Sequence, residues 1–351
     1  MSTDAYARSG VDQHAADRAV AALVGVLKTI DTGKASRSVL ASGHYAAVLE
    51  VAPNLGIAVG TDGVGSKLIL AEQTGRYDTV GIDCVAMNVN DVVCVGAEPI
   101  ALLDYLAVEQ ANPAVMEQIG IGLKKGAELA GVEIPGGEVA ILPELIQGHP
   151  SPNGFDLTAT CFGTVALDQM ITGEEIAPGD ALIGLPSSGL HSNSYSLARR
   201  ATQDLDLNGA FGDGTLADAL LEPTVIYVRA ALELIRSDVP VHGLAHITGG
   251  GLLNLLRLNE AVGFAITDPL PVPPVIDLVR ERGGVSDAEA WEVFNMGCGL
   301  VAVVPEAHAD AATALLDEHH PGTHRIGGVT DQAGRVTAPG IIGDKTGLRA
   351  A

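Results

Sequence analysis

The chain has 351 residues, 47% hydrophobic and 18% charged, so it can bury a large core, and its length indicates two domains. Its 43 acidic and 20 basic residues give a formal net charge of −23, which opposes binding to nucleic acid or to an anionic membrane surface. Charged residues interrupt the first twenty positions, no apolar stretch suits a bilayer, and the four cysteines form no paired motif. We therefore expect a soluble, cytoplasmic protein with neither a nucleic-acid nor a membrane partner.

Strand and helix patterns alternate through the first half of the chain. Strands are predicted at 55–62, 77–83 and 100–109, and helices at 84–97 and 112–131. The last of these helices has the clearest ends, because a proline stands near its start and a glycine follows it.

A polar, turn-rich stretch at 168–180 separates this half from a second alternating one. Beyond it the pattern predicts a strand at 181–189, helices at 192–201, 216–236 and 248–258, strands at 262–267 and 298–305, and then a helix from 306 and a final strand pair. The alternation predicts an α/β or α+β protein with domains at 1–167 and 168–351.

The stretch "GTDGVGSKL" at 60–68 is similar to a P-loop but differs from it in register. In a P-loop the lysine directly follows the last glycine, whereas here Ser66 precedes Lys67. A carboxylate inside a phosphate-binding loop is reasonable only if a divalent cation lies between the two. We therefore interpret Asp62 as a metal ligand and Lys67 as a neutraliser of phosphate; a simple turn with a capping aspartate explains the motif equally well.

Of two further acidic residues, one directly precedes the predicted helix at 84–97 and the other lies within it. Asp83 and Asp91 are eight residues apart, about 12 Å along a helix, so they are not expected to share an ion. Asp83 occupies the position of an N-cap. Asp91 lies among valines in mid-helix, where a solvated aspartate is unusual, which makes it the better metal candidate. Glu138 is a further candidate carboxylate in the first half.

Two turns in the second half contain small residues followed by a helical pattern. "LPSSGLHSNSYSLARR" at 185–200 offers backbone amides and His191, although an ordinary strand-to-helix turn is the favoured explanation there. "AHITGGGLLNLLRL" at 245–258 has three glycines that allow close approach of the backbone to an anion, and His246 lies beside them.

Together these stretches resemble the AIR synthetases, the phosphoribosylformylglycinamidine cyclo-ligase family of de novo purine synthesis. The resemblance extends from about residue 6 to residue 330, and its specific parts are the long segment at 77–107 and the N-terminal "SGVD". The matching segments are "YARSGVD" at 6–12, "GTDGVGSKL" at 60–68, "YDTVGIDCVAMNVNDVVCVGAEPIALLDYLA" at 77–107, "GGE" at 136–138, "FDLTATCFG" at 155–163, "SSGLHSNSYSLAR" at 187–199, "LAHITGGG" at 244–251 and "VFNMGCG" at 293–299.

The resemblance implies a homodimer whose N-terminal strands form a central β-barrel, with α/β C-terminal domains outside. It also implies an ATP- and magnesium-dependent reaction on formylglycinamidine ribonucleotide. ATP phosphorylates the formyl oxygen, the amidine nitrogen attacks the same carbon, and phosphate leaves to give aminoimidazole ribonucleotide and ADP. A small-molecule kinase of the same superfamily, such as thiamine-monophosphate kinase, is the alternative; a non-catalytic nucleotide-binding dimer is a third hypothesis.

Site residues follow from the matching positions. The implied metal ligands are Asp62, Asp91 and Glu138. The implied catalytic residues are His246, His191 and Lys67. The implied ATP- and phosphate-binding residues are Gly63, Gly65, Lys67, Ser187, Ser188, Gly189, Gly249, Gly250 and Gly251. In this chain Val139 and Ile141 follow Glu138, where the family usually has Thr and a second Glu.

Overall fold

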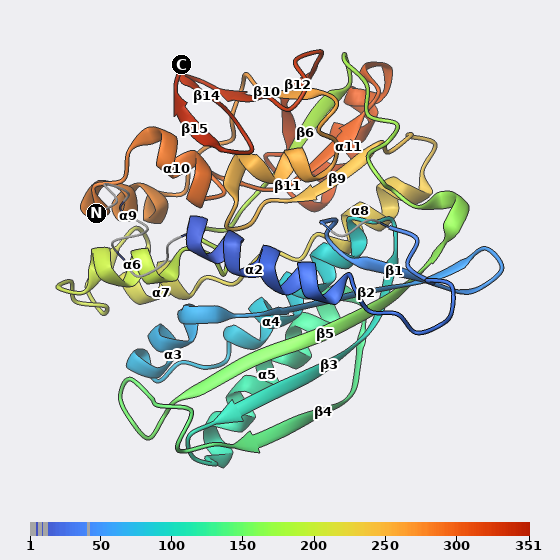
Figure 1. The fold of residues 1–351 in the computed structure, drawn as a ribbon. Helices are drawn as coiled ribbons and strands as arrows, with labels where there is room; N and C mark the ends of the chain where they lie inside the picture. Colours follow the sequence, from blue (N-terminus) through green and yellow to red (C-terminus); the bar gives the residue numbers. More distant parts are fainter. Residues whose placement is uncertain (1–4, 6–8, 10–12, 41–42) are drawn as a thin grey trace.

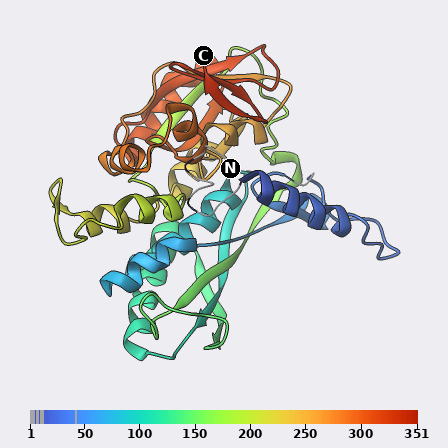
Figure 2. The ribbon, with the colours of Figure 1, turned by 60° about the vertical axis from the view of Figure 1, so that its left-hand side comes forward.

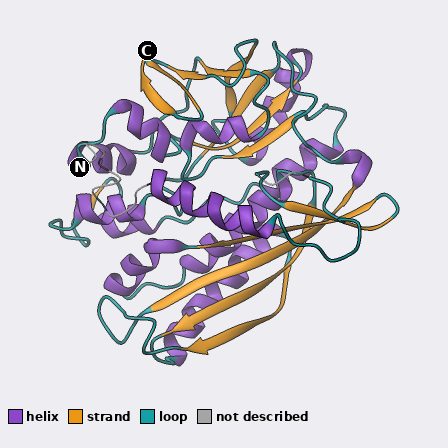
Figure 3. Cartoon of the chain, viewed as in Figure 1, coloured by secondary structure: helices purple, strands orange, loops and turns teal. Residues whose placement is uncertain are grey.

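The computed structural model describes residues 5, 9, 13–40 and 43–351 (Figure 1). Two β-sheets divide the molecule, one in each half of the chain (Figure 3). The first sheet has five strands in the order β1-β2-β5-β3-β4. Their bounds are β1 Ala47–Ala52, β2 Leu55–Gly63, β3 Glu98–Val108, β4 Glu133–Ile141 and β5 Phe155–Ala166.

Helices α4 (Val80–Val93) and α5 (Pro113–Ala130) cover one face of this sheet. Buried and partly exposed residues alternate along β5, so its odd-numbered side chains, such as Ala159 and Cys161, face the helices. The two helices pack very closely, because a side chain at Gly81 would meet the backbone of α5 at Leu123.

The opposite face of the same sheet leaves apolar side chains in solvent. Leu49, Leu55, Leu103 and Tyr105 point away from α4 and α5 and are each about two-fifths exposed (39%, 39%, 43% and 40%). A half-apolar sheet face of this kind is typical of a surface that packs against another element or chain.

The second sheet has eight strands in the order β15-β14-β13-β10-β12-β6-β11-β9, and only β10 and β13 pair in parallel. Their bounds are β6 Ala181–Pro186, β9 Gly243–His246, β10 Gly263–Ile266, β11 Cys298–Val304, β12 His324–Thr330, β13 Val336–Ala338, β14 Ile341–Asp344 and β15 Gly347–Ala350. A separate hairpin joins β7 (Ala210–Phe211) and β8 (Gly214–Thr215).

The remaining helices lie around the two sheets, and Figure 2 shows the two halves stacked one above the other with α2 at the side. Their bounds are α2 Gln13–Leu27, α3 Leu68–Thr74, α6 Tyr195–Thr202, α7 Leu216–Leu221, α8 Val228–Arg236, α9 Pro274–Gly283, α10 Asp287–Val293 and α11 Ala309–His319. The described residues also form four short 3₁₀ helices: η1 Gly65–Lys67, η2 Leu167–Gln169, η3 Gly251–Arg257 and η4 Glu306–His308. No helix in the described part of the chain is long and apolar enough to cross a membrane.

Most predicted elements are confirmed, and four are wrong in detail. The predicted final strand pair is four strands, β12 to β15. The segment at 77–83 is not a strand, because α4 already begins at Val80 and buries both its apolar and its polar residues. The helix predicted over 216–236 is two helices, α7 and α8, separated by a non-helical stretch that contains Pro223. The helix predicted over 248–258 is the 3₁₀ helix η3.

Candidate active site

Helix α4 joins the two halves of the molecule through polar side chains seven residues apart, which is two helical turns. Asp83 Oδ1 accepts hydrogen bonds from the backbone N (2.8 Å) and the hydroxyl (2.7 Å) of Thr224. Asn90 donates to the carbonyl of Val225 at 2.8 Å and accepts from the backbone N of Tyr227 at 2.9 Å. The loop between α7 and α8 is thereby held against the first domain.

Asp91, one position further along α4, meets His246 at the end of β9. Asp91 Oδ1 lies 2.8 Å from His246 Nδ1, and the imidazole is fully buried whereas the carboxylate remains 19% exposed. Asn90 Nδ2 lies 3.5 Å from His246 Nε2, so Asn90 donates to Nε2 while Nδ1 donates to Asp91. The carboxylate therefore has one oxygen fixed by the histidine and is still open to a ligand.

Asp62, near the end of β2, lies on the same side of the first sheet as α4. Its backbone N donates to Asn88 Oδ1 at 3.0 Å, and its Oδ1 accepts from the backbone N of Gly63 at 2.7 Å. Desolvation raises the pKa of Asp62, and repulsion from the nearby carboxylate of Asp91 adds to this effect. Two carboxylates that repel one another form a site whose charge a cation would offset.

Lys67 occupies a different place from the predicted one. Its ammonium is fully buried 2.8 Å from Asp83 Oδ2, and it donates to the carbonyls of His191 (3.1 Å) and Glu222 (2.7 Å). These three acceptors match the three donors of an ammonium group, so none is left for a phosphate in this arrangement. Burial lowers the pKa of Lys67, and Asp83 opposes that shift. The expectation that Lys67 contacts phosphate is therefore corrected to a structural role.

The prediction that Asp83 caps α4 is wrong as well. Thr79 occupies the N-cap position, and Asp83 lies within the first turn as the buried partner of Lys67. An ion pair that is fully buried must satisfy its remaining hydrogen-bonding groups, and Asp83 does so with Thr224.

Two backbone amides of the turn at 187–189 are already bonded within the protein. The backbone N of Ser187 donates to the carbonyl of Gly297 at 2.9 Å, and that of Ser188 donates to His191 Nε2 at 3.3 Å. The carbonyl of Gly189 accepts from Asn295. The expected phosphate contacts through the amides of Ser187 and Ser188 are therefore corrected: these amides stabilise the turn.

His191 is fully buried with a backbone φ of 60°, beside the ammonium of Lys67. Burial lowers its pKa well below the usual value, with the neighbouring His246 and Lys67 adding to the shift, so the ring is neutral at pH 7. Because Nε2 accepts from Ser188, the proton is on Nδ1, which has no hydrogen-bond partner among the described residues. His191 lies next to the site without reaching its surface.

The glycines at 249–251 lie in the turn that follows His246. Gly251 has a φ of +51°, and a side chain there would meet the carbonyl of Trp291, which explains the glycine. Gly249 and Gly250 are partly exposed, and Gly249 packs against Asn193, whose side chain belongs to the turn before α6. The glycine turn therefore lies against Asn193 and directly follows His246 in the chain.

Glu138 does not join the other two carboxylates. It pairs with Tyr105 in the register of β4 and β3, on the face of the sheet away from α4, whereas Asp62 faces α4. Within the described residues, no group of three or more His, Cys, Asp or Glu is placed to hold a metal ion. Glu138, predicted as a third metal ligand, therefore lies apart from Asp62 and Asp91 within one chain.

Two asparagines of α4 belong to the site but were not identified from the sequence. Asn88 fixes the strand end that carries Asp62, and Asn90 fixes the loop after Pro223 and orients His246. Their signal was present in "NVND", since amides are unusual in an otherwise apolar helix that packs on both sides.

Comparison with known proteins shows to which family the chain belongs. The N-terminal domain model of the AIR synthase related proteins matches residues 43–165, and the C-terminal domain model matches residues 177–338. A protein of Methanothermobacter thermautotrophicus named phosphoribosylformylglycinamidine cyclo-ligase is 47% identical, with 97% of this chain and 98% of that protein covered. One of Pyrococcus furiosus with the same name is 44% identical, with 98% of each chain covered.

Solved structures with the same fold are more distant in sequence. The hydrogenase maturation protein HypE has a TM-score of 0.62 at 23% identity, covering 89% of this chain and 91% of that one. A structure titled AaThiL complexed with AMPPCP and TMP has a TM-score of 0.59 at 18% identity, covering 85% of this chain and 88% of that one. The two domain models and the near-complete match to the curated relatives thus establish that this chain belongs to the AIR synthase related family.

Proposed function

We propose that this protein is a phosphoribosylformylglycinamidine cyclo-ligase, which converts formylglycinamidine ribonucleotide to aminoimidazole ribonucleotide while ATP is converted to ADP and phosphate. The observation that supports this most strongly is identity of 44–47% to proteins of that name over almost the whole chain. ATP as a substrate is also supported by fold neighbours solved with ATP, AMPPCP or ADP.

The reaction is mainly a matter of position and charge. The formyl oxygen takes the terminal phosphoryl group of ATP, the amidine nitrogen attacks the same carbon, and the C–O bond breaks as phosphate leaves. Because the attack is intramolecular, a site that holds the amidine nitrogen close to the formyl carbon of the substrate accounts for much of the rate enhancement. The Asp91–His246 pair is the candidate to orient the reacting groups, because it combines a fixed imidazole with a partly exposed carboxylate.

Magnesium fits the Asp62 and Asp91 carboxylates. Magnesium bound to a nucleotide needs only one or two protein carboxylates, with phosphate oxygens and water completing the shell. The carboxylates of Asp62 and Asp91 are two hard oxygen donors that meet this requirement. Desolvation and the nearby Asp91 raise the pKa of Asp62. When bound, the ion would neutralise the phosphate charge that develops during transfer; the two aspartates would hold it, and His246 would fix the orientation of Asp91.

The raised pKa of Asp62 makes metal binding sensitive to pH. Binding of Mg²⁺ alone can be titrated by calorimetry at a series of pH values from pH 8 downwards. We expect the affinity for Mg²⁺ to be highest above the pKa of Asp62 and to fall as the pH is lowered through that pKa. This loss begins at a higher pH than for an ordinary aspartate, because the proton competes earlier. Asp62→Asn should weaken binding and remove this part of the pH dependence. Asp168→Asn, at an aspartate that accepts from Asn54, should leave the curve unchanged; an identical pH curve for Asp62→Asn would remove Asp62 from the metal site.

We also propose that the protein is a homodimer that joins through the exposed face of the first sheet. The partly exposed apolar residues of that face support a partner of the same kind, and Glu138 lies on it beside Tyr105. Glu138 is accordingly proposed to act at the interface rather than in the metal site of its own chain. A cytoplasmic location is proposed with it, which the four free thiols support.

Leu103→Glu tests the dimer. A carboxylate introduced at this 43% exposed position would be buried in the interface, so sedimentation should show a shift from dimer to monomer with little change in the stability of the monomer fold. Leu129→Glu is the matched control, since Leu129 is 42% exposed on α5, on the other side of the sheet. A monomeric wild-type protein would contradict the proposal outright.

The activity itself is tested with purified protein, Mg²⁺, ATP and formylglycinamidine ribonucleotide. ADP and the aminoimidazole product should appear in equal amounts, and neither should appear without both substrates. The alternative, a small-molecule kinase, would release ADP with a different acceptor, such as thiamine monophosphate, and would form no imidazole.

A further inference from the structure

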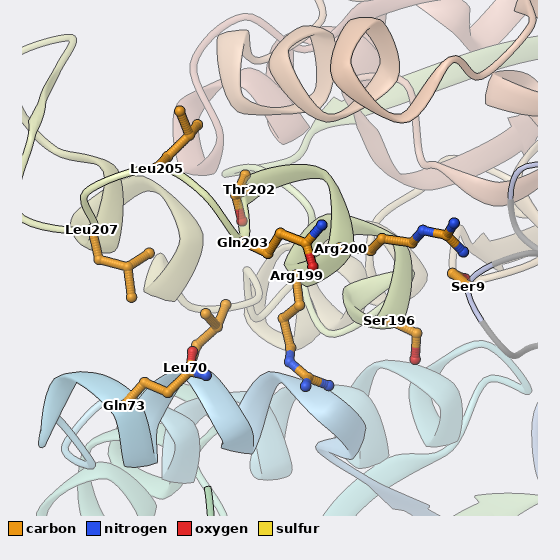
Figure 4. Close-up of a pocket in the computed structure, with 10 residues that line it drawn as sticks. All are labelled: Ser9, Leu70, Gln73, Ser196, Arg199, Arg200, Thr202, Gln203, Leu205 and Leu207. Carbon is orange, nitrogen blue, oxygen red and sulfur yellow. The ribbon is translucent and has the colours of Figure 1, made fainter. Parts of the chain in front are cut away.

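A pocket of about 580 Å³ lies between α3 and α6, apart from the Asp62–Asp91 pair. Its polar walls are supplied by Gln73 of α3, by Ser196, Arg199 and Arg200 of α6, and by Gln203 just after that helix (Figure 4). None of these side chains has a role in the site described above.

The pocket is basic in a strongly acidic protein. The whole chain has 20 Lys and Arg against 43 Asp and Glu, yet two consecutive arginines line this one cavity and none of its ten described lining residues is acidic. A cavity with fixed positive charge and no carboxylate favours an anion.

Arg199 has a donor that the protein leaves unsatisfied. Its Nε is buried without a hydrogen-bond partner among the described residues, and Glu72 acts on its guanidinium only as a nearby charge. Figure 4 shows the Arg199 side chain directed toward α3 and that of Arg200 directed toward Ser9, with Ser196 near the space between them. A buried N–H group is costly without an acceptor, so an unpartnered one in a pocket wall indicates that a ligand supplies the acceptor.

The pocket adjoins the loop that carries Asp62. Ser196 Oγ lies 3.3 Å from Ser66 Oγ, and Ser66 follows Asp62 by four residues in the "GTDGVGSKL" loop. Helix α6 also begins directly after the turn whose Asn193 packs against Gly249, beside the Asp91–His246 pair. A ligand anchored by Arg199 would therefore lie next to the loop that carries Asp62.

We infer that Arg199 and Arg200 bind the phosphate monoester of the nucleotide substrate, the group on the ribose of formylglycinamidine ribonucleotide. This identification of the ligand rests on the proposed function. A phosphate monoester is a compact dianion, and guanidinium groups bind it by paired charge-assisted hydrogen bonds without a metal. The phosphates of ATP differ in this respect, because Mg²⁺ accompanies them and the cation site lies at Asp62 and Asp91 instead.

The inference is tested by Arg199→Gln and Arg200→Gln, with Arg236→Gln as control. Arg236 is an exposed arginine paired with Glu98 far from the pocket, so its loss changes the net charge equally. We expect each pocket variant to raise KM for formylglycinamidine ribonucleotide roughly 10- to 100-fold, with KM for ATP and the thermal midpoint unchanged. Arg199→Lys should recover part of the loss.

Binding of ribose 5-phosphate by calorimetry, with ribose as the blank, gives a readout that does not need turnover. Wild type and Arg236→Gln should bind it, and the two pocket variants should bind it at least roughly 10-fold more weakly. Arg199-dependent binding in a protein that makes no imidazole would uphold the pocket while the proposed function fails. Unchanged binding and KM in both variants would overturn the inference, as would a rise in KM for ATP alone, which would assign the pocket to the nucleoside triphosphate. If Arg199→Gln does not fold, the exposed Arg200 decides the matter by itself.

Discussion

Asp91→Asn should lower kcat by about a thousandfold or more, corresponding to about 4 kcal/mol of lost transition-state stabilisation. Asp91 is a partly exposed carboxylate, it is held by His246 Nδ1 at 2.8 Å, and it is one of the two proposed magnesium ligands. Asparagine is nearly the same shape, and its oxygen can still accept from His246, so the loss would come from the missing charge. Coupled measurement of ADP and imidazole formation checks the rate.

Two controls separate charge from structure in this variant. The thermal midpoint and the association state of Asp91→Asn should match the wild type, because the helix and the hydrogen bond to His246 remain. Glu98→Gln, which removes a surface carboxylate paired with Arg236, should keep normal turnover. Turnover by Asp91→Asn at the wild-type rate would exclude Asp91 from metal binding and from catalysis.

Lys67→Met should reduce the free energy of unfolding by about 3–5 kcal/mol, because it leaves the carboxylate of Asp83 buried without its partner. It also leaves the carbonyls of His191 and Glu222 without their donor. Denaturant unfolding followed by circular dichroism measures the loss.

Removing the second charge distinguishes the structural role of Lys67 from the phosphate contact that its sequence motif suggests. In the double variant Lys67→Met/Asp83→Asn, the amide oxygen that replaces the carboxylate can still accept from Thr224, and no unpaired charge remains, so stability should recover in part. A phosphate-binding lysine would behave differently: Lys67→Met would then raise KM for ATP while the unfolding curve stayed in place.

Local signals predicted the elements with well-marked ends. The proline and glycine that bound α5, and the strand β3, were predicted correctly. The stretch at 77–83 failed because alternation of apolar and polar residues also fits a helix buried on two sides, as α4 is. Its packing depends on the sheet on one side and on residues 224–227 on the other, and neither is visible in a local window.

The residues of the candidate site also differ in how far the local sequence could predict their contacts. Asp91 was singled out because a solvated aspartate is unusual in mid-helix, and the structure pairs it with a histidine 155 residues away, while its binding of a metal ion stays a prediction. Lys67 was misplaced because its partners come from distant positions, namely Asp83, His191 and Glu222. A glycine-rich loop with a lysine identifies a flexible, polar turn, but only the tertiary contacts decide whether the ammonium faces solvent or the interior.

The buried ion pair has a consequence for how the chain can be divided. Both charged groups come from the first half, whereas three of the groups that solvate them, the carbonyls of His191 and Glu222 and the amide of Thr224, come from the second. A fragment that ends after β5 would keep the two charges and lose most of their hydrogen-bond partners, and it would expose the apolar side of α4 to water. The two halves are therefore thermodynamically coupled: they should melt in a single cooperative transition, and neither is expected to be a self-sufficient folding module.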